Sequence, residues 1–340
     1  MDTTPPDAPG TGQPHAGTRE GATAFRLRPL GVGDLVDETI NLLRANFVVL
    51  AVLAGAPTIA ATVVLLVVAA AVGVAAFGSV MMQLMTGGVE ALNPALLGNI
   101  IGSLIAFGLF AIVILIVANA LATGGVTYAV SQLYLGRRVT IAEAYQAVVP
   151  RLLALILAPM IVTVLALIII AAVALVFGGI GAAANFSALA ACGFVLVGLP
   201  LLIFLSIKFC VINPAIVVEG LGPVGGIARS WGLVSDHFWR VFLIWLVFLA
   251  LAIVIFLIQG LVSGIFGGIL SGAAVAQVVV EQVVSLFFQI VLTLLGIIVA
   301  TLIYYDLRVR KEGFDLETMA NQLGARASGP GPATPPMPPY

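Results

Sequence analysis

Residues 152–178 read LLALILAPMIVTVLALIIIAAVALVFG, an uninterrupted apolar segment without a charged side chain. About 20 apolar residues in a helix are enough to cross the ~30 Å hydrocarbon layer of a bilayer. The segment is too long and too continuous for the short, alternating strands of a membrane β-barrel. It therefore predicts a transmembrane helix.

The rest of the chain has the same character. Of its 340 residues, 61% are hydrophobic and only 9% are charged, whereas a soluble domain carries about 25% charged residues. These values exclude a water-soluble globular protein, a disordered chain and a basic nucleic-acid binder. Six segments have the length and composition of membrane spans: 47–77, 100–132, 152–178, 189–212, 241–266 and 283–305.

The spans define three parts of the chain. Residues 1–25 are rich in Pro, Gly, Thr and Asp, which predicts a disordered N-terminal tail. Residues 26–320 form the six-span membrane domain. Residues 325–340 are rich in proline and predict a second disordered tail, which is either a ligand for a proline-reading module or a plain solubilising tail.

The few charges predict the orientation. Loops 78–99 and 267–282 carry only Glu90 and Glu281, and loop 179–188 carries no charge. With six spans, all 14 Lys and Arg residues fall on the other side. The positive-inside rule then places both termini in the cytoplasm. The Arg-, Ala-, Gly- and Val-rich composition suggests a bacterial protein, and hence a multi-pass protein of the inner membrane.

A pattern recurs before each odd-numbered span. Three segments align on Leu-Gly pairs, and the positions 5, 8, 9 and 12 residues after each glycine trace one helical face. A polar residue follows at position 15 and an apolar one at position 16. The aligned pairs are Leu30-Gly31, Leu135-Gly136 and Leu221-Gly222.

Each aligned segment has the pattern of a short amphipathic helix lying in the headgroup plane. The expected fold is thus an all-α bundle of six transmembrane helices, arranged as three helical hairpins that each follow a cytoplasmic interfacial helix. The hairpins form a parallel repeat, with copies near 30–134, 135–220 and 221–312.

Three stretches resemble a known family: 28–47, which opens Arg-Pro-Leu-Gly; 213–240, with Asn213-Pro214 and Phe238-Trp239-Arg240; and 304–317, with Tyr304-Tyr305-Asp306. Together they are similar to the membrane domain of the bacterial glycerophosphoryl diester phosphodiesterase membrane-domain family, related to the YciC-like membrane proteins. The resemblance covers roughly 26–320. Some family members carry a fused catalytic barrel, which needs about 250 residues of alternating strands and helices. Only short tails flank the spans here, so the resemblance implies no phosphodiesterase activity.

The sequence offers two sets of candidate site residues. The first is a set of arginines with two alternative roles. They either bind anionic lipid headgroups or partners, or only determine the orientation of the protein in the membrane. Acids on the same face, such as Glu219 and Asp306, are expected to pair with these arginines. The arginines are Arg137, Arg138, Arg151, Arg229, Arg240, Arg308 and Arg310.

The second set is an intramembrane polar group. Glu281 stands where the sixth span begins, either at membrane depth or just outside the hydrocarbon. Asn213-Pro214 is expected to break the fourth span and expose carbonyl groups. Lys208 is expected to extend its ammonium group toward the interface. The residues of the polar group are Gln259, Glu281, Gln282, Gln289 and Asn213.

No catalytic, cofactor or metal motif is present. The sequence has no HExxH, no CxxC and no P-loop. Cys192 and Cys210 are interpreted as small buried hydrophobic residues. We therefore predict a non-enzymatic membrane protein with no cofactor and no nucleic-acid partner. It serves as a scaffold or accessory for envelope or lipid processes, with lipids and a membrane or cytoplasmic protein as partners. The alternative is a small transporter or lipid-handling protein with a polar path between the hairpins.

Overall fold

The computed structural model describes residues 31–87, 94–183 and 188–313, all of them in helices or the short connections between helices. The predicted tails 1–25 and 325–340, and Glu90, lie outside this part. Within it, six helical segments are long and apolar enough to cross a membrane. The predicted all-α membrane bundle is thus confirmed, and the protein is a multi-pass membrane protein. The six segments are Phe47–Met82, Gly98–Tyr134, Ile141–Ala183, Ala191–Glu219, Phe238–Ile269 and Ala274–Glu312.

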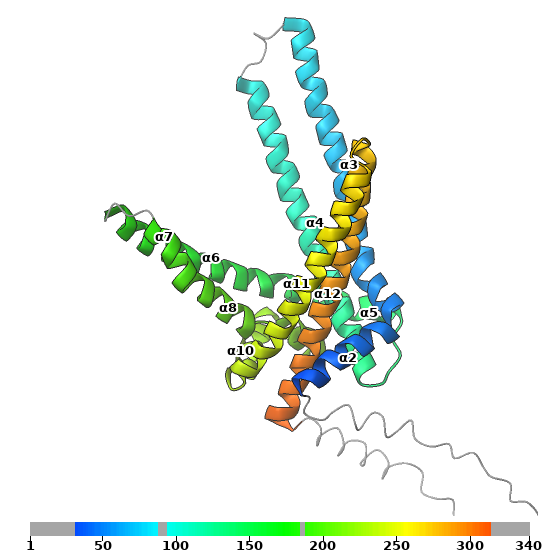
Figure 1. Cartoon of the computed structure of the whole chain (residues 1–340), viewed down its shortest axis with the longest axis vertical. Coiled ribbons are helices and arrows are strands. Elements are labelled where there is room, and N and C mark those ends of the chain that lie inside the picture. The colour runs from blue at the N-terminus through cyan, green and yellow to red at the C-terminus, as the bar shows by residue number, and fades with distance from the viewer. Residues whose placement is uncertain (1–30, 88–93, 184–187, 314–340) are drawn as a thin grey trace, which may run out of the picture.

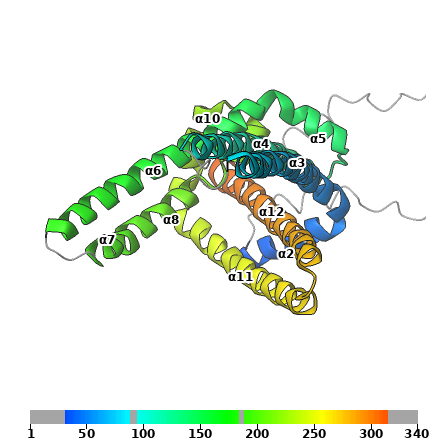
Figure 2. The ribbon, with the colours of Figure 1, turned by 90° about the horizontal axis from the view of Figure 1, so that it is seen from above.

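The long helices form three antiparallel hairpins (Figure 1). The first pairs α3 (Phe47–Gly87) with α4 (Pro94–Tyr134), and the third pairs α11 (Phe238–Ile269) with α12 (Ala274–Glu312). In the second, α6 (Leu152–Ala183) runs beside a segmented arm that diverges with it from the other two hairpins (Figures 1 and 2). The arm consists of α7 (Ala188–Gly193), a π-helical turn (Phe194–Gly198), α8 (Leu199–Lys208) and α9 (Ile212–Glu219).

The segmented arm is interrupted close to where the sequence predicted a break. The helix ends at Lys208, turns through 209–211 and restarts at Ile212. Pro214 therefore lies in the first turn of α9, where a missing N–H leaves no hydrogen bond unmade. The break precedes Asn213-Pro214 instead of falling on it.

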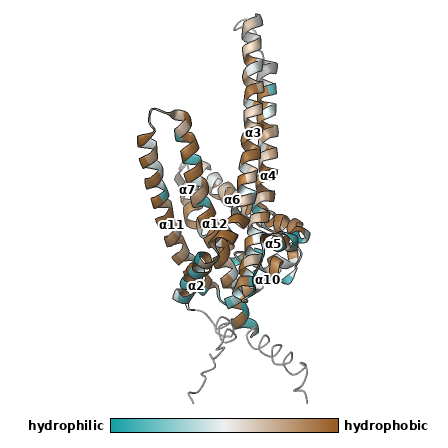
Figure 3. Cartoon of the chain, turned by 90° about the vertical axis from the view of Figure 1, so that its right-hand side faces the viewer, coloured by the Kyte–Doolittle hydropathy of each residue, from teal (hydrophilic) through white to brown (hydrophobic). Residues whose placement is uncertain are grey.

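Three short amphipathic helices lie at one end of the bundle: α2 (Val32–Ala45), α5 (Ile141–Val148) and α10 (Pro223–Ser235). Their starts follow local chemistry. The backbone N–H of Gly31 donates to Asp34, Thr140 and Glu143 cap α5 reciprocally, and Pro223 opens α10. Figure 3 shows the hydrophilic residues gathered at this end, which we call the charged end.

The three amphipathic helices share a register with the long helices that follow them. Each long helix begins sixteen residues after the aligned glycine, at Phe47, Leu152 and Phe238. The residue eight positions after each glycine is fully buried, and the residues 19 and 22 positions after it are also buried. These are Thr39, Ala144 and Ser230; then Leu50, Leu155 and Val241; then Leu53, Ala158 and Ile244.

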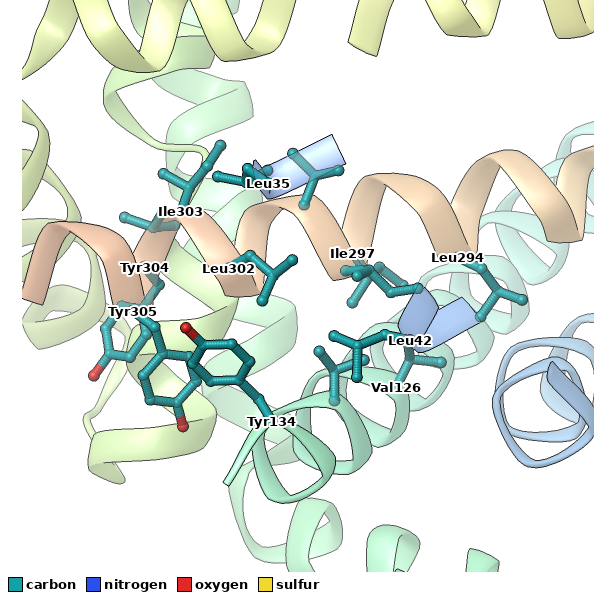
Figure 4. Close-up of a cluster of buried hydrophobic side chains, with 14 of the residues drawn as sticks. Leu35, Leu42, Val126, Tyr134, Leu294, Ile297, Leu302, Ile303, Tyr304 and Tyr305 are labelled. Atoms are coloured by element: carbon teal, nitrogen blue, oxygen red, sulfur yellow. The ribbon is translucent and has the colours of Figure 1, made fainter. Parts of the chain in front are cut away.

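The core is built around the second half of α12. Buried residues run from Leu294 to Val309 along this helix and meet α2, α3, α4 and α11. Figure 4 shows Leu302 and Tyr305 of α12 facing Val126 and Tyr134 of α4, with Leu35 of α2 close by. The rings of Tyr134 and Tyr305 lie 5.2 Å apart, centroid to centroid. The core thus lies toward the charged end, while the far halves of the hairpins have exposed apolar side chains, as expected for helices solvated by lipid.

Candidate functional site

An ionic cluster centred on Arg229 ties α10 to its neighbours at the charged end. Its Nε lies 2.8 Å from Oε1 of Glu219, and a terminal guanidinium nitrogen donates to Oε2 of Glu312 at 2.8 Å. Hydrogen bonding to Glu312 raises the pKa of Arg229 above its ordinary value. Tyr304 donates its hydroxyl to Glu219 at 2.7 Å, and Arg308 donates to Glu312 at 3.2 Å. The cluster joins α9, α10 and α12.

Asp306 is the centre of a second ionic cluster. Its side chain is 1% exposed and accepts hydrogen bonds from Arg240 at 2.9 Å and from Arg310 at 3.0 Å. Arg240 comes from the start of α11, and Arg310 lies one turn further along α12. The pairing that the sequence predicted between acids and arginines on this face is therefore present for Glu219 and Asp306.

Arg151 has a structural contact of its own. Its guanidinium donates to the backbone carbonyl of Val217 and lies against Gly220. Gly220 ends α9 with φ of +70°, a conformation that glycine adopts without strain. Arg151 thereby ties the start of α6 to the end of α9.

Among the residues that the structure describes, two of the seven predicted arginines have no ion-pair partner and remain exposed. Arg137 and Arg138 are exposed in the turn between α4 and α5, and neither forms an ion pair with any residue the structure describes. The other five are engaged inside the protein. For those five arginines, the contacts favour a role in holding the helices together over the binding of a lipid headgroup or a partner.

Lys208, which the sequence predicted to extend its ammonium group toward the interface, reaches α10 at the charged end and is enclosed there by the protein. Its side chain is buried, with Nζ 4.7 Å from the ring centroid of Trp231, 5.6 Å from Phe204 and 5.9 Å from Phe238. It also donates to the hydroxyl of Ser235 at 2.9 Å. Cation–π contacts replace water around the ammonium group. They hold α8, α10 and α11 together.

The five residues of the predicted intramembrane polar group do not line one common cleft. Glu281, Gln282 and Gln289 are exposed along the first half of α12, and Gln259 is half-buried in α11. Asn213, by contrast, lines two clefts, and the other four residues line neither of them.

The first cleft lies between α4 and α6 and has a volume of about 430 Å³. Most of its wall is apolar, and two of its lining residues, Met160 and Val164, are themselves exposed on α6. The cleft therefore opens sideways, toward the lipid. Its polar lining consists of Asn119, Thr123, Thr163 and Asn213.

The second cleft lies on the α12 side of α9 and has a volume of about 270 Å³. Thr123 and Asn213 line both clefts, so the two adjoin at these residues. Thr127 lines the second cleft; its side chain is fully buried, and its hydroxyl has no hydrogen-bond partner. A buried hydroxyl without a partner costs about 1–3 kcal/mol, so this group is an exception within a well-satisfied core.

Sequence reasoning missed Thr123 and Thr127, although a signal for them exists. Asn119, Thr123 and Thr127 are spaced four residues apart, which places them in one row along α4. Thr123 donates to the amide oxygen of Asn119 at 2.9 Å, as such a row requires. In an otherwise apolar span, polar residues at this spacing indicate one polar stripe.

A model of the family "Domain of unknown function (DUF7847)" matches residues 39–307. The chain belongs to this family. No curated protein and no solved structure matches the chain.

The DUF7847 match contains both clefts and most of the ionic contacts. All cleft-lining residues, from Ile116 to Ala300, fall inside it, as do Arg229, Arg240 and Asp306. Glu312, which completes the Arg229 cluster, lies just beyond its end. Among the residues that the structure describes, no three His, Cys, Asp or Glu side chains are placed to hold a metal ion.

Proposed function

We propose that this protein is a non-catalytic scaffold or accessory for envelope or lipid processes and that it works through its charged end. The observation that carries the proposal is the arrangement of three amphipathic helices at that end, α10 held by ion pairs and α2 and α5 by buried apolar contacts, with Arg137 and Arg138 left exposed between α4 and α5. A rigid platform that presents two free arginines suits an anionic lipid headgroup or an acidic partner.

We place the charged end in the cytoplasm of a bacterial cell, with the bundle in the inner membrane. The bases of the described residues support this orientation, because they lie in α2 and α10, in the connections on either side of α5, or at the adjoining ends of the long helices. The positive-inside rule favours such an end on the cytoplasmic side.

We also propose that the three units are copies of one ancestral unit. The shared start of the long helices and the shared buried positions after each glycine support this repeat. A relationship to the glycerophosphoryl diester phosphodiesterase membrane-domain family belongs to the same proposal. It rests on the sequence stretches quoted above and carries over no activity.

Native mass spectrometry tests the charged-end proposal. The full-length protein is released from micelles containing phosphatidylglycerol, and lipid adducts are counted for the wild type and for Arg137→Ala/Arg138→Ala. We expect the double alanine variant to lose most adducts. The matched Arg137→Lys/Arg138→Lys variant keeps the charge and should retain most of them. Equal adducts on all three proteins would refute the proposal.

The lateral cleft favours a second candidate function, lipid handling along a polar path between the hairpins. The path runs along Asn119, Thr123 and Asn213 and not, as the sequence suggested, through Gln259, Glu281 and Gln289. This candidate is independent of Arg137 and Arg138, which line neither cleft.

A further inference from the structure

We propose that the two adjoining clefts form one binding site for a neutral lipid: a long-chain molecule whose polar group is an uncharged hydroxyl or ester. The proposal concerns the lipid-handling candidate and does not depend on the charged-end function. It rests on what lines the clefts, on the shape of the first cleft and on the unpartnered hydroxyl of Thr127.

The residues that line the clefts disfavour a ligand with a charged head. The two clefts are lined by apolar residues, hydroxyls, two amides and a cysteine, with no Lys, Arg, His, Asp or Glu among the lining residues. An anionic head in such a place would be desolvated without a compensating cation, which is costly. An uncharged oxygen atom needs only a hydrogen bond. Thr and Asn side chains supply donors and acceptors for it.

The cleft shape suits a chain-bearing molecule. The α6 arm diverges from the α3–α4 hairpin (Figure 1), and the first cleft opens between α4 and α6 with exposed apolar residues at its edge. A lipid chain can lie in this cleft. The polar group then reaches the junction at Thr123 and Asn213, and Thr127, whose buried hydroxyl has no partner, belongs to the wall of the adjoining cleft. A hydrogen bond there would satisfy the one buried hydroxyl of α4 that lacks a partner.

Photo-crosslinking in liposomes tests the site. The probe is a diacylglycerol with a diazirine on one acyl chain, and the comparison probe is phosphatidic acid with the same chains. We expect saturable labelling of α4 or α6 by the diacylglycerol and weak labelling by phosphatidic acid. Equal labelling by the two probes would overturn the selection for a neutral head. Absence of saturable labelling of α4 and α6 by either probe would overturn the lipid assignment.

Two single-residue variants test whether the polar group of the lipid binds at Thr127. Thr127→Val replaces an unpartnered hydroxyl by a methyl group of similar size, so the protein should fold as before while the diacylglycerol probe labels it about fivefold more weakly. The matched control is Thr301→Val on α12, because the Thr301 hydroxyl donates to its own helix at Ile297 and lines neither cleft. Unchanged labelling of Thr127→Val, or equal loss in both variants, would overturn the role of Thr127.

A variant that fills the second cleft with a larger side chain provides a second test of the binding site. A Cβ at Gly296, which lines the second cleft, meets no atom within 4 Å. Gly296→Val should therefore fold normally and reduce diacylglycerol labelling by occupying the space. All three variants keep Arg137 and Arg138. The phosphatidylglycerol adducts should thus stay as in the wild type, which separates failure of this site from failure of the charged-end proposal.

Discussion

Arg240 and Asp306 form an ion pair between the third hairpin's two helices, with 2.9 Å between Nε and Oδ2. The Asp306 side chain is 1% exposed and the Arg240 side chain 22% exposed, so the acid is the buried partner. Arg310 contacts the same carboxylate from one turn away. A buried carboxylate between two arginines fixes the angle at which α11 and α12 meet at the charged end.

Asp306→Asn should lower the free energy of unfolding by about 2–3 kcal/mol, because two guanidinium groups lose their charged acceptor while remaining partly buried. Thermal unfolding of the purified protein in detergent measures the loss. Asp37→Asn, at an exposed position of α2, is the control and should change little. A loss of similar size in both variants would show that net charge, and not this ion pair, is responsible.

Two tyrosines allow the effect of acceptor charge to be measured. Tyr304 donates to the carboxylate of Glu219 at 2.7 Å, and Tyr145 donates to the neutral carbonyl of Leu53 at 3.0 Å. Hydrogen bonds to charged groups stabilise by about 1.5–3 kcal/mol and neutral ones by about 0.5–1.5 kcal/mol. Tyr304→Phe should therefore lower the melting temperature more than Tyr145→Phe. The reverse order would show that Glu219 is satisfied by Arg229 alone.

Helix α10 contains a matched pair of glycines. A Cβ on Gly226 would lie 2.5 Å from Cγ1 of Ile216, whereas a Cβ on Gly232 would meet nothing within 4 Å. Gly226→Ala should destabilise the protein by about 1–3 kcal/mol through overpacking against α9. Gly232→Ala should be neutral or stabilise by up to about 1 kcal/mol through helix propensity. Equal stability of the two variants would show that α9 moves to accommodate the added methyl group.

The pair between Asp236 and Lys311 should make stability depend on pH in acid. The hydrogen bond from Lys311 lowers the pKa of Asp236 below its ordinary value. A carboxyl whose pKa is lower in the folded state stabilises that state at pH above its unfolded pKa, near 4, and the effect disappears as the pH falls through the folded pKa. The difference in melting temperature between the wild type and Asp236→Asn should thus be constant from pH 7 to 5 and shrink below about pH 4. A difference that is unchanged down to pH 3 would contradict this role.

Cysteine labelling tests the orientation. In a Cys192→Ala/Cys210→Ala background, Ser271→Cys lies in the turn between α11 and α12, and Arg138→Cys lies at the charged end. A membrane-impermeant maleimide should label Ser271→Cys in intact spheroplasts and Arg138→Cys only in inverted vesicles. The opposite pattern would place the charged end outside the cytoplasm.

The sequence by itself determined the helical spans and the amphipathic helices between them. Long uncharged segments such as 152–178 have one stable state in lipid, because a helix alone satisfies every backbone hydrogen bond. The three amphipathic helices followed equally from local pattern, since the spacing after Gly31, Gly136 and Gly222 allows only one face to be buried.

Tertiary structure decided which polar residues meet. Arg151, Arg229 and Arg240 are used inside the protein because helix packing brings carboxylates and carbonyls of other helices within reach. Arg308 and Arg310, by contrast, pair with acids one turn away in α12, at a spacing that is visible in the sequence. Lys208 is enclosed by Trp231 and Phe238, which lie more than twenty residues away in sequence. The junction of Thr127 with Asn213 depends likewise on how α4 packs against α9. Lipid solvates all apolar helix faces alike, so side-chain shape and hydrogen bonding determine this packing, and hydrophobicity read along the chain does not reveal it.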